Sequence, residues 1–200
     1  MEKTTLRKII KTQIAALSPE QFTAAGTAAA GQLPLLPHWD EFRSVLAFFS
    51  MKDEIDTRPI MEIIIKTGKS LFVPKIESKM LTFYRIDQND LEHHTTTASN
   101  TTFGSGYREP KTDPNLILKP KNFPALVITP GLAFDRCRNR LGRGLGYYDR
   151  FFAALDLSGR NYTALGLCMP CQLAGKIPVD PWDKKMDALL TEALILDSDS

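Results

Sequence analysis

The sequence has no long apolar run, few cysteines and little excess charge of either sign. Its longest apolar stretches, such as Val45 to Phe49 and Ala125 to Ile128, have the length of a strand, whereas a membrane-spanning helix needs roughly 18 apolar residues. The N-terminal residues mix acidic, basic and apolar side chains and lack the apolar core and cleavage site of a signal peptide. We therefore exclude a membrane protein and expect the N-terminus to belong to the mature fold.

Cysteine is scarce, with Cys137, Cys168 and Cys171 as the only three in the sequence. An odd number in a chain of this length argues against a disulfide framework and favours a reducing compartment, most simply the cytoplasm. Cys168 and Cys171 form a C-x-x-C pair, but a zinc site needs about four ligands and a redox pair normally opens a helix near the start of its domain. The pattern favours two structural cysteines.

His93 and His94 lie in a polar segment, which favours solvated side chains over a metal site.

The overall charge is also small. A formal net charge of +2 does not indicate nucleic-acid binding, and the one basic cluster, between Arg136 and Arg150, indicates a local anionic ligand instead. The chain of 200 residues has 43% hydrophobic and 24% charged residues, which is ordinary for a globular protein. We expect a single domain over residues 1–200, a monomer with small-molecule partners and no membrane or nucleic-acid partner.

Hydrophobic spacing predicts an amphipathic helix from the N-terminus to Leu17, with Lys3 and Arg7 on its polar side. A second helix begins after the capping sequence Ser18 to Gln21 and runs toward Gln32. Further helices are predicted over residues 58–66, stopped by Gly68, and over residues 148–157. Strands are predicted over residues 44–50, 70–75, 80–86, 125–129, 162–167 and 193–196.

The segment from Asp87 to Asn122 has few apolar residues, so we predict a long loop there. Such loops are uncommon unless they bind a ligand or partner, and both a binding loop and plain disorder stay open. Alternation of strands and helices predicts an α/β fold, a single three-layer domain whose central sheet is mostly parallel and flanked by helices. Ligands of such sheets bind at the carboxyl ends of the strands.

The most informative segment is residues 130–151, with the sequence PGLAFDRCRNRLGRGLGYYDRF. Its three glycines alternate just before a predicted helix, and Arg140 and Arg143 stand beside them. Glycines let a backbone approach an oxyanion, and a helix start and guanidinium groups attract one. These features predict a polyphosphate cradle, with a tight connection and solvated arginines as the alternative. The spacing matches neither the phosphate loop ending in Gly-Lys-Ser/Thr nor the dinucleotide G-x-G-x-x-G pattern.

P-G-x-A-F-D followed by R-L-G-x-G-x-G-Y-Y-D-R resembles the signature of the 5-formyltetrahydrofolate cyclo-ligases, also called methenyltetrahydrofolate synthetases. Four further stretches, LRKIIKTQIAALSPEQ, FFSMKDEIDT, YREP and PWDKKMDALLTE, are similar to segments of that family, so the likeness covers most of the chain. The resemblance implies a fold like that of the sugar-phosphate isomerase and coenzyme A transferase superfamily. It also implies ATP- and Mg²⁺-dependent closure of 5-formyltetrahydrofolate to 5,10-methenyltetrahydrofolate, with release of ADP and phosphate.

The resemblance assigns expected roles to individual residues. Positions expected to bind ATP are Lys3, Arg7, Arg140, Leu141, Gly142, Arg143, Gly144, Leu145, Gly146, Tyr147 and Tyr148. Positions expected to bind the folate are Phe49, Glu54, Arg143, Gly144, Leu145, Gly146 and Tyr147. Asp149 and Asp183 match the magnesium-associated acids, and Arg143 and Tyr147 are the expected catalytic residues, with Arg143 nearest the transferred phosphate. Without the resemblance, Phe49 would be a core residue, and Glu54 and Asp183 solvated turn charges.

The chain departs from the family pattern at a few positions. Arg138 stands where the family usually has glycine in the turn after F-D, Leu145 occupies a variable position, and Trp182 precedes Asp183. In the implied reaction the N5-formyl oxygen attacks the γ-phosphate of ATP, N10 then attacks the phosphorylated intermediate, and loss of phosphate closes the ring. Two alternatives stay open: another phosphate-handling enzyme on a related sheet, and an inactive folate- or nucleotide-binding module.

Overall fold

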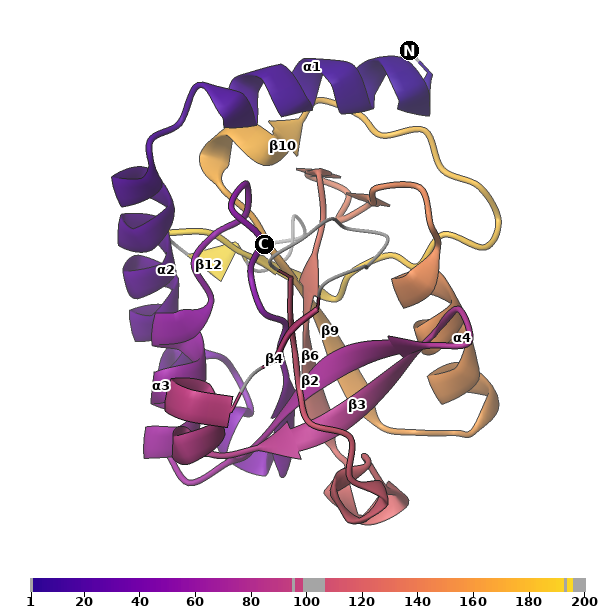
Figure 1. The fold of residues 1–200 in the computed structure, drawn as a ribbon. Helices are drawn as coiled ribbons and strands as arrows, with labels where there is room; N and C mark the ends of the chain where they lie inside the picture. The colour runs from indigo at the N-terminus through magenta and orange to yellow at the C-terminus, as the bar shows by residue number, and fades with distance from the viewer. Residues whose placement is uncertain (1, 95, 99–106, 193, 196–200) are drawn as a thin grey trace.

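The computed structural model describes residues 2–94, 96–98, 107–192 and 194–195 (Figure 1). A seven-stranded sheet forms the centre, in the order β12-β11-β9-β6-β1-β2-β3. Its strands are β1 Ser44–Leu46, β2 Ser70–Glu77, β3 Met80–Ile86, β6 Ala125–Pro130, β9 Tyr162–Leu167, β11 Ala188–Leu190 and β12 Leu194–Ile195. The five inner strands pair in parallel, and the edge strands β3 and β12 pair antiparallel. The predicted α/β fold with a mostly parallel sheet is confirmed.

Helices cover both faces of this sheet. Those on one face are α2 Pro19–Gln32 and α3 Arg58–Lys66, and α4 Tyr147–Leu157 packs on the other (Figure 1). Strand alternation explains the two layers, because neighbouring side chains point to opposite faces. Leu126 and Ile128 of β6 pack with α2 and α3, whereas Val127 between them packs with Phe152 of α4.

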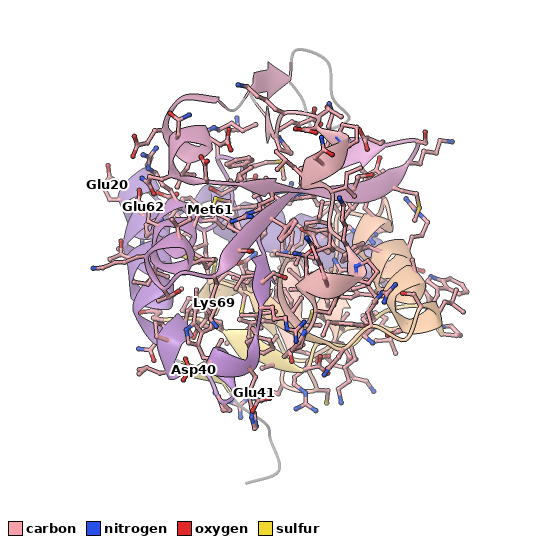
Figure 2. The ribbon with its side chains drawn as sticks, turned by 90° about the horizontal axis from the view of Figure 1, so that it is seen from below. Glu20, Asp40, Glu41, Met61, Glu62 and Lys69 are labelled. Atoms are coloured by element: carbon pink, nitrogen blue, oxygen red, sulfur yellow. The ribbon has the colours of Figure 1, made fainter. Side chains whose placement is uncertain are left out.

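The first helix, α1 Lys3–Ala15, crosses the end of the sheet at which β6 stops (Figure 1). Leu6, Ile10 and Ile14 are buried, at the spacing that the sequence predicts. At the opposite end, which faces the viewer in Figure 2, the Lys69 ammonium donates a hydrogen bond of 2.9 Å to the carbonyl of Phe42. Phe42 precedes β1 and Lys69 precedes β2, so this contact marks the end at which the parallel strands begin. The α1 end of the sheet is therefore the one at which these strands have their carboxyl termini.

Local sequence explains where the helices begin and stop. The Ser18 N–H donates a hydrogen bond of 2.9 Å to the Gln21 side chain, as in the predicted capping box of α2. Gly68 follows α3 with a φ of +77°, a left-handed conformation that glycine adopts without strain. The predicted boundaries of α2 and α3 agree with the structure.

The predicted strand over residues 44–50 is too long, because β1 ends at Leu46. Thr57 takes the backbone groups that a longer strand would use. Its hydroxyl donates a hydrogen bond of 2.6 Å to the carbonyl of Phe48 and accepts one of 3.1 Å from the N–H of Ser50. The chain therefore leaves the sheet early and carries Phe49 toward the space beneath α1.

The predicted long loop over residues 87–122 is also wrong in part. The segment holds a π-helical turn, η3 Asp90–His94, a pair of antiparallel strands, β4 Thr96–Ala98 and β5 Tyr107–Glu109, and two 3-10 turns, η4 Pro114–Leu116 and η5 Pro120–Asn122. Elements this short need few buried side chains, so the polar sequence conceals them. Residues 99–106 lie outside the described part of the chain, and with them the prediction of a binding loop or disorder.

Four short strands escaped the sequence analysis: β7 Ala133–Asp135, β8 Arg140–Leu141, β10 Leu173–Ala174 and β11 Ala188–Leu190. Segments of two or three residues give no readable alternation. The predicted last strand over residues 193–196 corresponds to β12, and its two end residues fall outside the described ones. Across the described residues, no helix is long and apolar enough to cross a membrane.

Candidate active site

A cavity of about 750 Å³ opens at the carboxyl ends of β1 and β6, beneath α1. All the residues that the sequence analysis assigned to ATP, folate or magnesium line it. They come from α1, the segment after β1, the glycine loop between β8 and α4, and the segment around Asp183. The fold thus gathers positions up to 180 residues apart in sequence, as the hydrogen bond between Lys3 and Asp183 illustrates.

The glycine loop owes its shape to two left-handed residues. Gly144 has a φ of +102°, and Gly146 has a φ of +65° and caps the N-terminus of α4. A residue with a Cβ is strained at such angles, which explains why glycine stands at both. Gly142 has a different reason, since a Cβ there would lie 2.9 Å from a guanidinium nitrogen of Arg140. The glycines therefore fit the loop closely around its arginines.

Four of the basic side chains in the cavity are paired with acids. Lys3 binds Asp180 at 2.6 Å and also Asp183. The pair that Arg140 makes with Asp149 measures 2.7 Å. Arg143 contacts Asp53 at 2.9 Å and Glu54 at 3.2 Å, and Lys184 contacts Asp156 at 3.2 Å. These pairs hold charged groups of both signs in place around the cavity.

Glu54 lies in the interior of this network, with a side chain only 10% exposed. Burial raises the pKa of its carboxyl group, while the charge of Arg143 and the N–H of Met51, which donates a hydrogen bond of 3.0 Å, oppose that rise. Burial alone would lower the pKa of Arg143, but the hydrogen bond to Asp53 and the charge of Glu54 raise it. Arg143 is therefore held as a cation between the glycine loop and the segment after β1.

Two guanidinium groups in the cavity contact carbonyl oxygens. The Nε of Arg7 donates a hydrogen bond of 3.0 Å to the carbonyl of Gly142, and Arg150 donates bonds of 3.0 and 2.8 Å to the carbonyls of Leu145 and Lys79. Among the described residues, neither has a carboxylate within salt-bridge distance. The buried Nε of Arg140 has no hydrogen-bond partner there either. These groups of the cavity wall can accept an anion without breaking an ion pair.

The other end is apolar. Phe48 and Phe49 approach from the segment after β1, and Pro74, Ile76 and Leu81 from the β2–β3 hairpin. A mixed cavity of this kind suits a ligand with a flat ring next to a second ligand that carries phosphates. Sequence reasoning missed the hairpin residues, because nothing in their local pattern separates a cavity wall from a core.

Several polar residues of the site were missed as well. Asp53 shares Arg143 with Glu54, Asp180 shares Lys3 with Asp183, and Arg150 braces the loop. Asp53 and Asp180 do lie in or beside the quoted FFSMKDEIDT and PWDKKMDALLTE stretches, so adjacency to them was the available signal. Trp182 lines the cavity and is 71% exposed.

Asp149 and Asp183 both line the cavity, but each is held by a basic residue. Within the described ranges, no group of three or more histidine, cysteine, aspartate or glutamate residues is placed to hold a metal ion. Magnesium commonly binds through one or two carboxylates together with substrate phosphates. The two aspartates fit a metal that is bound with a nucleotide and do not form a cage of protein ligands.

The turn with the unusual Arg138 keeps its shape. Arg138 has a φ of +65°, its N–H donates a hydrogen bond of 2.8 Å to the carbonyl of Asp135, and its carbonyl accepts one of 3.0 Å from Met186. The left-handed angle explains why glycine suits this position. The C-x-x-C cysteines are both free, and burial followed by the charge of Cys171 raises the pKa of Cys168 to about 12. A thiol so protonated is a poor nucleophile.

An α/β domain with an anion-accepting, partly apolar cavity at the carboxyl ends of its parallel strands defines the class of nucleotide- and cofactor-handling α/β enzymes. Within that class, the chain belongs to the 5-formyltetrahydrofolate cyclo-ligase family, whose model matches residues 1–192.

Individual relatives agree with the family match over nearly the whole chain. The chain is 30% identical to the probable 5-formyltetrahydrofolate cyclo-ligase of Schizosaccharomyces pombe, over 98% of each protein. The Escherichia coli K12 enzyme of the same name is 29% identical, over 94% of this chain and 98% of its own length. Among solved structures, the 5,10-methenyltetrahydrofolate synthetase of Aquifex aeolicus matches with a TM-score of 0.78 and 27% identity, covering 100% of this chain and 95% of that one. The predicted family is confirmed.

Proposed function

We propose that this protein is an ATP-dependent 5-formyltetrahydrofolate cyclo-ligase that forms 5,10-methenyltetrahydrofolate, ADP and phosphate. Beyond family membership, the position of Arg143 carries the proposal. Arg143 belongs to the glycine loop, yet its guanidinium contacts Asp53 and Glu54, which follow β1. It therefore links the phosphate-binding end of the cavity to the apolar end, where a folate would meet ATP.

At the phosphate end, Lys3, Arg7 and residues 140–148 would bind ATP. The support is the contact of Arg7 with Gly142, the left-handed Gly144 and Gly146, and the positive end of α4 that follows them. The buried Nε of Arg140 adds an unused donor. Backbone N–H groups and guanidinium groups together match the geometry of phosphate oxygens.

At the other end, Phe49 and Glu54 would bind the pterin ring of 5-formyltetrahydrofolate. Phe49 offers an apolar face, and a carboxylate such as that of Glu54 can accept hydrogen bonds from the amino and ring N–H groups of a pterin. Arg143 orients this carboxylate from one side, and the N–H of Met51 from the other. Residues 143–147 would complete the wall of the folate site where it meets the nucleotide.

The reaction needs no protein nucleophile, because the substrate supplies both nucleophiles. The formyl oxygen attacks the γ-phosphorus as the bond to ADP breaks, and N10 then attacks the activated formyl carbon. The bond from N10 to this carbon closes the five-membered ring, and loss of phosphate and of the N10 proton then gives the methenyl product. Arg143 and Tyr147, which both line the cavity, would align the formyl group with the phosphate and stabilise its charge, which is how phosphoryl transfer is generally catalysed.

Asp149 and Asp183 would hold Mg²⁺ alongside the phosphates of ATP, with Arg140 and Lys3 orienting the two carboxylates beforehand. The bound ion would neutralise charge on the phosphates during transfer. The three free cysteines support a cytoplasmic location, and the mixed polar and apolar lining of the large cavity supports small-molecule substrates.

The test mixes the purified protein with 5-formyltetrahydrofolate and Mg-ATP and follows the near-ultraviolet absorbance of the methenyl product. We expect product only when both ATP and Mg²⁺ are present, and a much slower rate in Glu54→Gln. The control variant Glu41→Gln removes a carboxylate that is 70% exposed and does not line the cavity, and it should leave the rate unchanged. A folded protein that binds ATP and forms no product would be an inactive binding module instead.

A further inference from the structure

A second, smaller cavity of about 100 Å³ shares the side chain of Phe49 with the large cavity of the candidate site. It is enclosed by the start of α3, the turn η3 and strand β5, and its walls include Arg58, Met61, Leu91 and Arg108. Phe49 lines both cavities. A ligand that packs against this ring in the large cavity would therefore lie next to the small one.

Two arginines give the small cavity its character. The Arg108 guanidinium lies 5.0 Å from the centre of the Phe49 ring and donates a hydrogen bond of 3.1 Å to the carbonyl of Leu91. Arg58, on the first turn of α3, is oriented by a hydrogen bond of 2.9 Å from its Nε to Glu62. In Figure 2, Met61 marks the inner side of α3, and the exposed Glu62 marks its outer side.

The lining of the small cavity includes two arginines and one acid, and Arg58 also forms an ion pair with Glu62. Burial lowers the pKa of Arg108, and the nearby positive charge of Arg58 lowers it further. The acid on the wall is Asp56, whose carboxylate accepts a hydrogen bond of 3.0 Å from the backbone N–H of Arg58 and so caps α3. Two guanidinium groups facing one small cavity repel each other, and an anion bound between them would relieve that repulsion.

We propose that Arg58 and Arg108 bind a carboxylate of the glutamate tail of the folate substrate. The inference rests on the proposed function and extends it. 5-Formyltetrahydrofolate joins a flat pterin, through an aminobenzoyl ring, to a glutamate with two carboxylates. With the pterin beside Glu54 and the aminobenzoyl ring against Phe49, which lines both cavities, the glutamate would lie in the small cavity beside the two arginines. The role explains the otherwise unused YREP stretch, of which Arg108 is the arginine.

The test compares two substrates: 5-formyltetrahydrofolate and the 5-formyl derivative of tetrahydropteroate, which lacks the glutamate. For the unaltered protein we expect KM to be roughly 10- to 100-fold higher for the glutamate-free compound, with kcat changed little, because a charge-assisted contact is lost far from the reacting atoms. Arg108→Ala should raise KM for 5-formyltetrahydrofolate by a similar factor and leave both constants for the glutamate-free compound unchanged.

Controls separate recognition of the tail from folding. Arg85→Ala removes an exposed guanidinium that lines neither cavity and should behave as the unaltered protein. Arg58→Ala offers a second removal of charge if Arg108→Ala fails to fold, and Arg108→Lys should restore part of the lost affinity. If Arg108→Ala and Arg58→Ala each raised KM equally for the substrate with glutamate and the one without it, the proposed carboxylate site would be wrong. Equal KM values of the unaltered protein for both compounds would also overturn it. Failure of the unaltered protein to convert either compound would instead refute the proposed function.

Discussion

Arg143 belongs to the glycine loop, and its positive charge contacts two acids of the segment after β1 on the same cavity. Its contacts with Asp53 and Glu54 fix the direction of the guanidinium before any ligand binds, so this group would need little reorganisation in the phosphoryl transfer that we propose. The same contacts keep the buried carboxyl group of Glu54 beside a positive charge. At the scale of single residues, the site consists of such opposed pairs rather than of isolated catalytic groups.

Removal of this charge should therefore affect the reaction strongly. We expect Arg143→Ala to lower kcat about 10²- to 10³-fold, the effect typical of losing one preorganised donor to a developing charge. Steady-state kinetics with both substrates saturating measures it, with thermal unfolding as a check on folding. The matched control is Arg136→Ala, since Arg136 is exposed and does not line the cavity. Near-normal turnover in Arg143→Ala would rule out its catalytic role.

Tyr162 gives a test of the electrostatics near the cavity wall. Burial, and then the hydrogen bond to Asp156, raise the pKa of its hydroxyl from 10.0 to about 12, although Lys184 opposes the shift. A raised pKa in the folded state adds stability that is complete below pH 10 and is lost as the pH rises toward 12. As the pH rises from 10 to 12, the free energy of unfolding should therefore fall less in Tyr162→Phe than in the unaltered protein.

Two measurements check this prediction. Absorbance of tyrosinate during alkaline titration should show a late step in the unaltered protein that is smaller by one tyrosine in Tyr162→Phe, where Tyr84, whose pKa is also raised by burial, remains. Urea unfolding at several alkaline pH values should show the smaller slope in the variant. Loss of a step near pH 10 instead of the late one would mean that Tyr162 ionises as an ordinary tyrosine.

At the scale of elements, the junction between the glycine loop and α4 depends on a left-handed glycine that also lines the cavity. Gly146, the residue before α4, and Gly159, shortly after it, both have left-handed φ values, of +65° and +62°. A Cβ at Gly146 would lie 3.1 Å from a guanidinium nitrogen of Arg150, whereas one at Gly159 would meet nothing within 4 Å. The two glycines thus have the same left-handed backbone conformation, but only Gly146 lies close to another side chain.

Alanine substitution at these positions should separate stability from binding. Gly146→Ala and Gly159→Ala should each lower the free energy of unfolding by about 1 kcal/mol, because alanine is strained at a left-handed φ. Only Gly146→Ala should also lower the affinity for ATP, since the added methyl group displaces Arg150 and the glycine loop. Denaturant unfolding and calorimetric titration with ATP measure the two effects. An equal loss of ATP affinity in both variants would contradict a direct role for the loop.

At the scale of the whole molecule, α1 and the segment around Asp183 close the cavity from opposite ends of the chain. Lys3 binds Asp180 and Asp183, and Arg7 binds the carbonyl of Gly142 in the glycine loop. These polar contacts and a narrow apolar stripe hold the helix over the sheet. A ligand that binds Lys3 and Arg7 would therefore strengthen the attachment of α1.

Hydrogen exchange with and without Mg-ATP tests this closure. We expect slower exchange in α1, the glycine loop and residues 180–184, and little change in α2, which contributes no residue to the cavity. Lys3→Met should reduce the protection of α1 while leaving the unliganded fold intact. Uniform protection of the whole chain, α2 included, would indicate global stabilisation without closure of α1.

The sequence by itself determined the long elements, the class of sheet and the family. Helix caps, hydrophobic spacing and a distinctive glycine stretch act over a few residues, so they can be recognised without knowledge of the rest of the chain. The α2 capping box, the stop at Gly68 and β3 over Met80–Ile86 all agree with local pattern. The resemblance in turn named residues that the structure brings around one cavity.

Only the tertiary structure decided the partners of those residues and the short elements between them. Arg143 contacts acids 89 and 90 positions away, and no local pattern specifies such a pairing. β1 ends early because the hydroxyl of Thr57, nine residues beyond Phe48, takes a carbonyl that the sheet would otherwise use. The second cavity depends on the meeting of α3, η3 and β5. Contacts between distant segments arise from packing of the whole chain, which is why local sequence indicates the site residues and the fold alone sets their geometry.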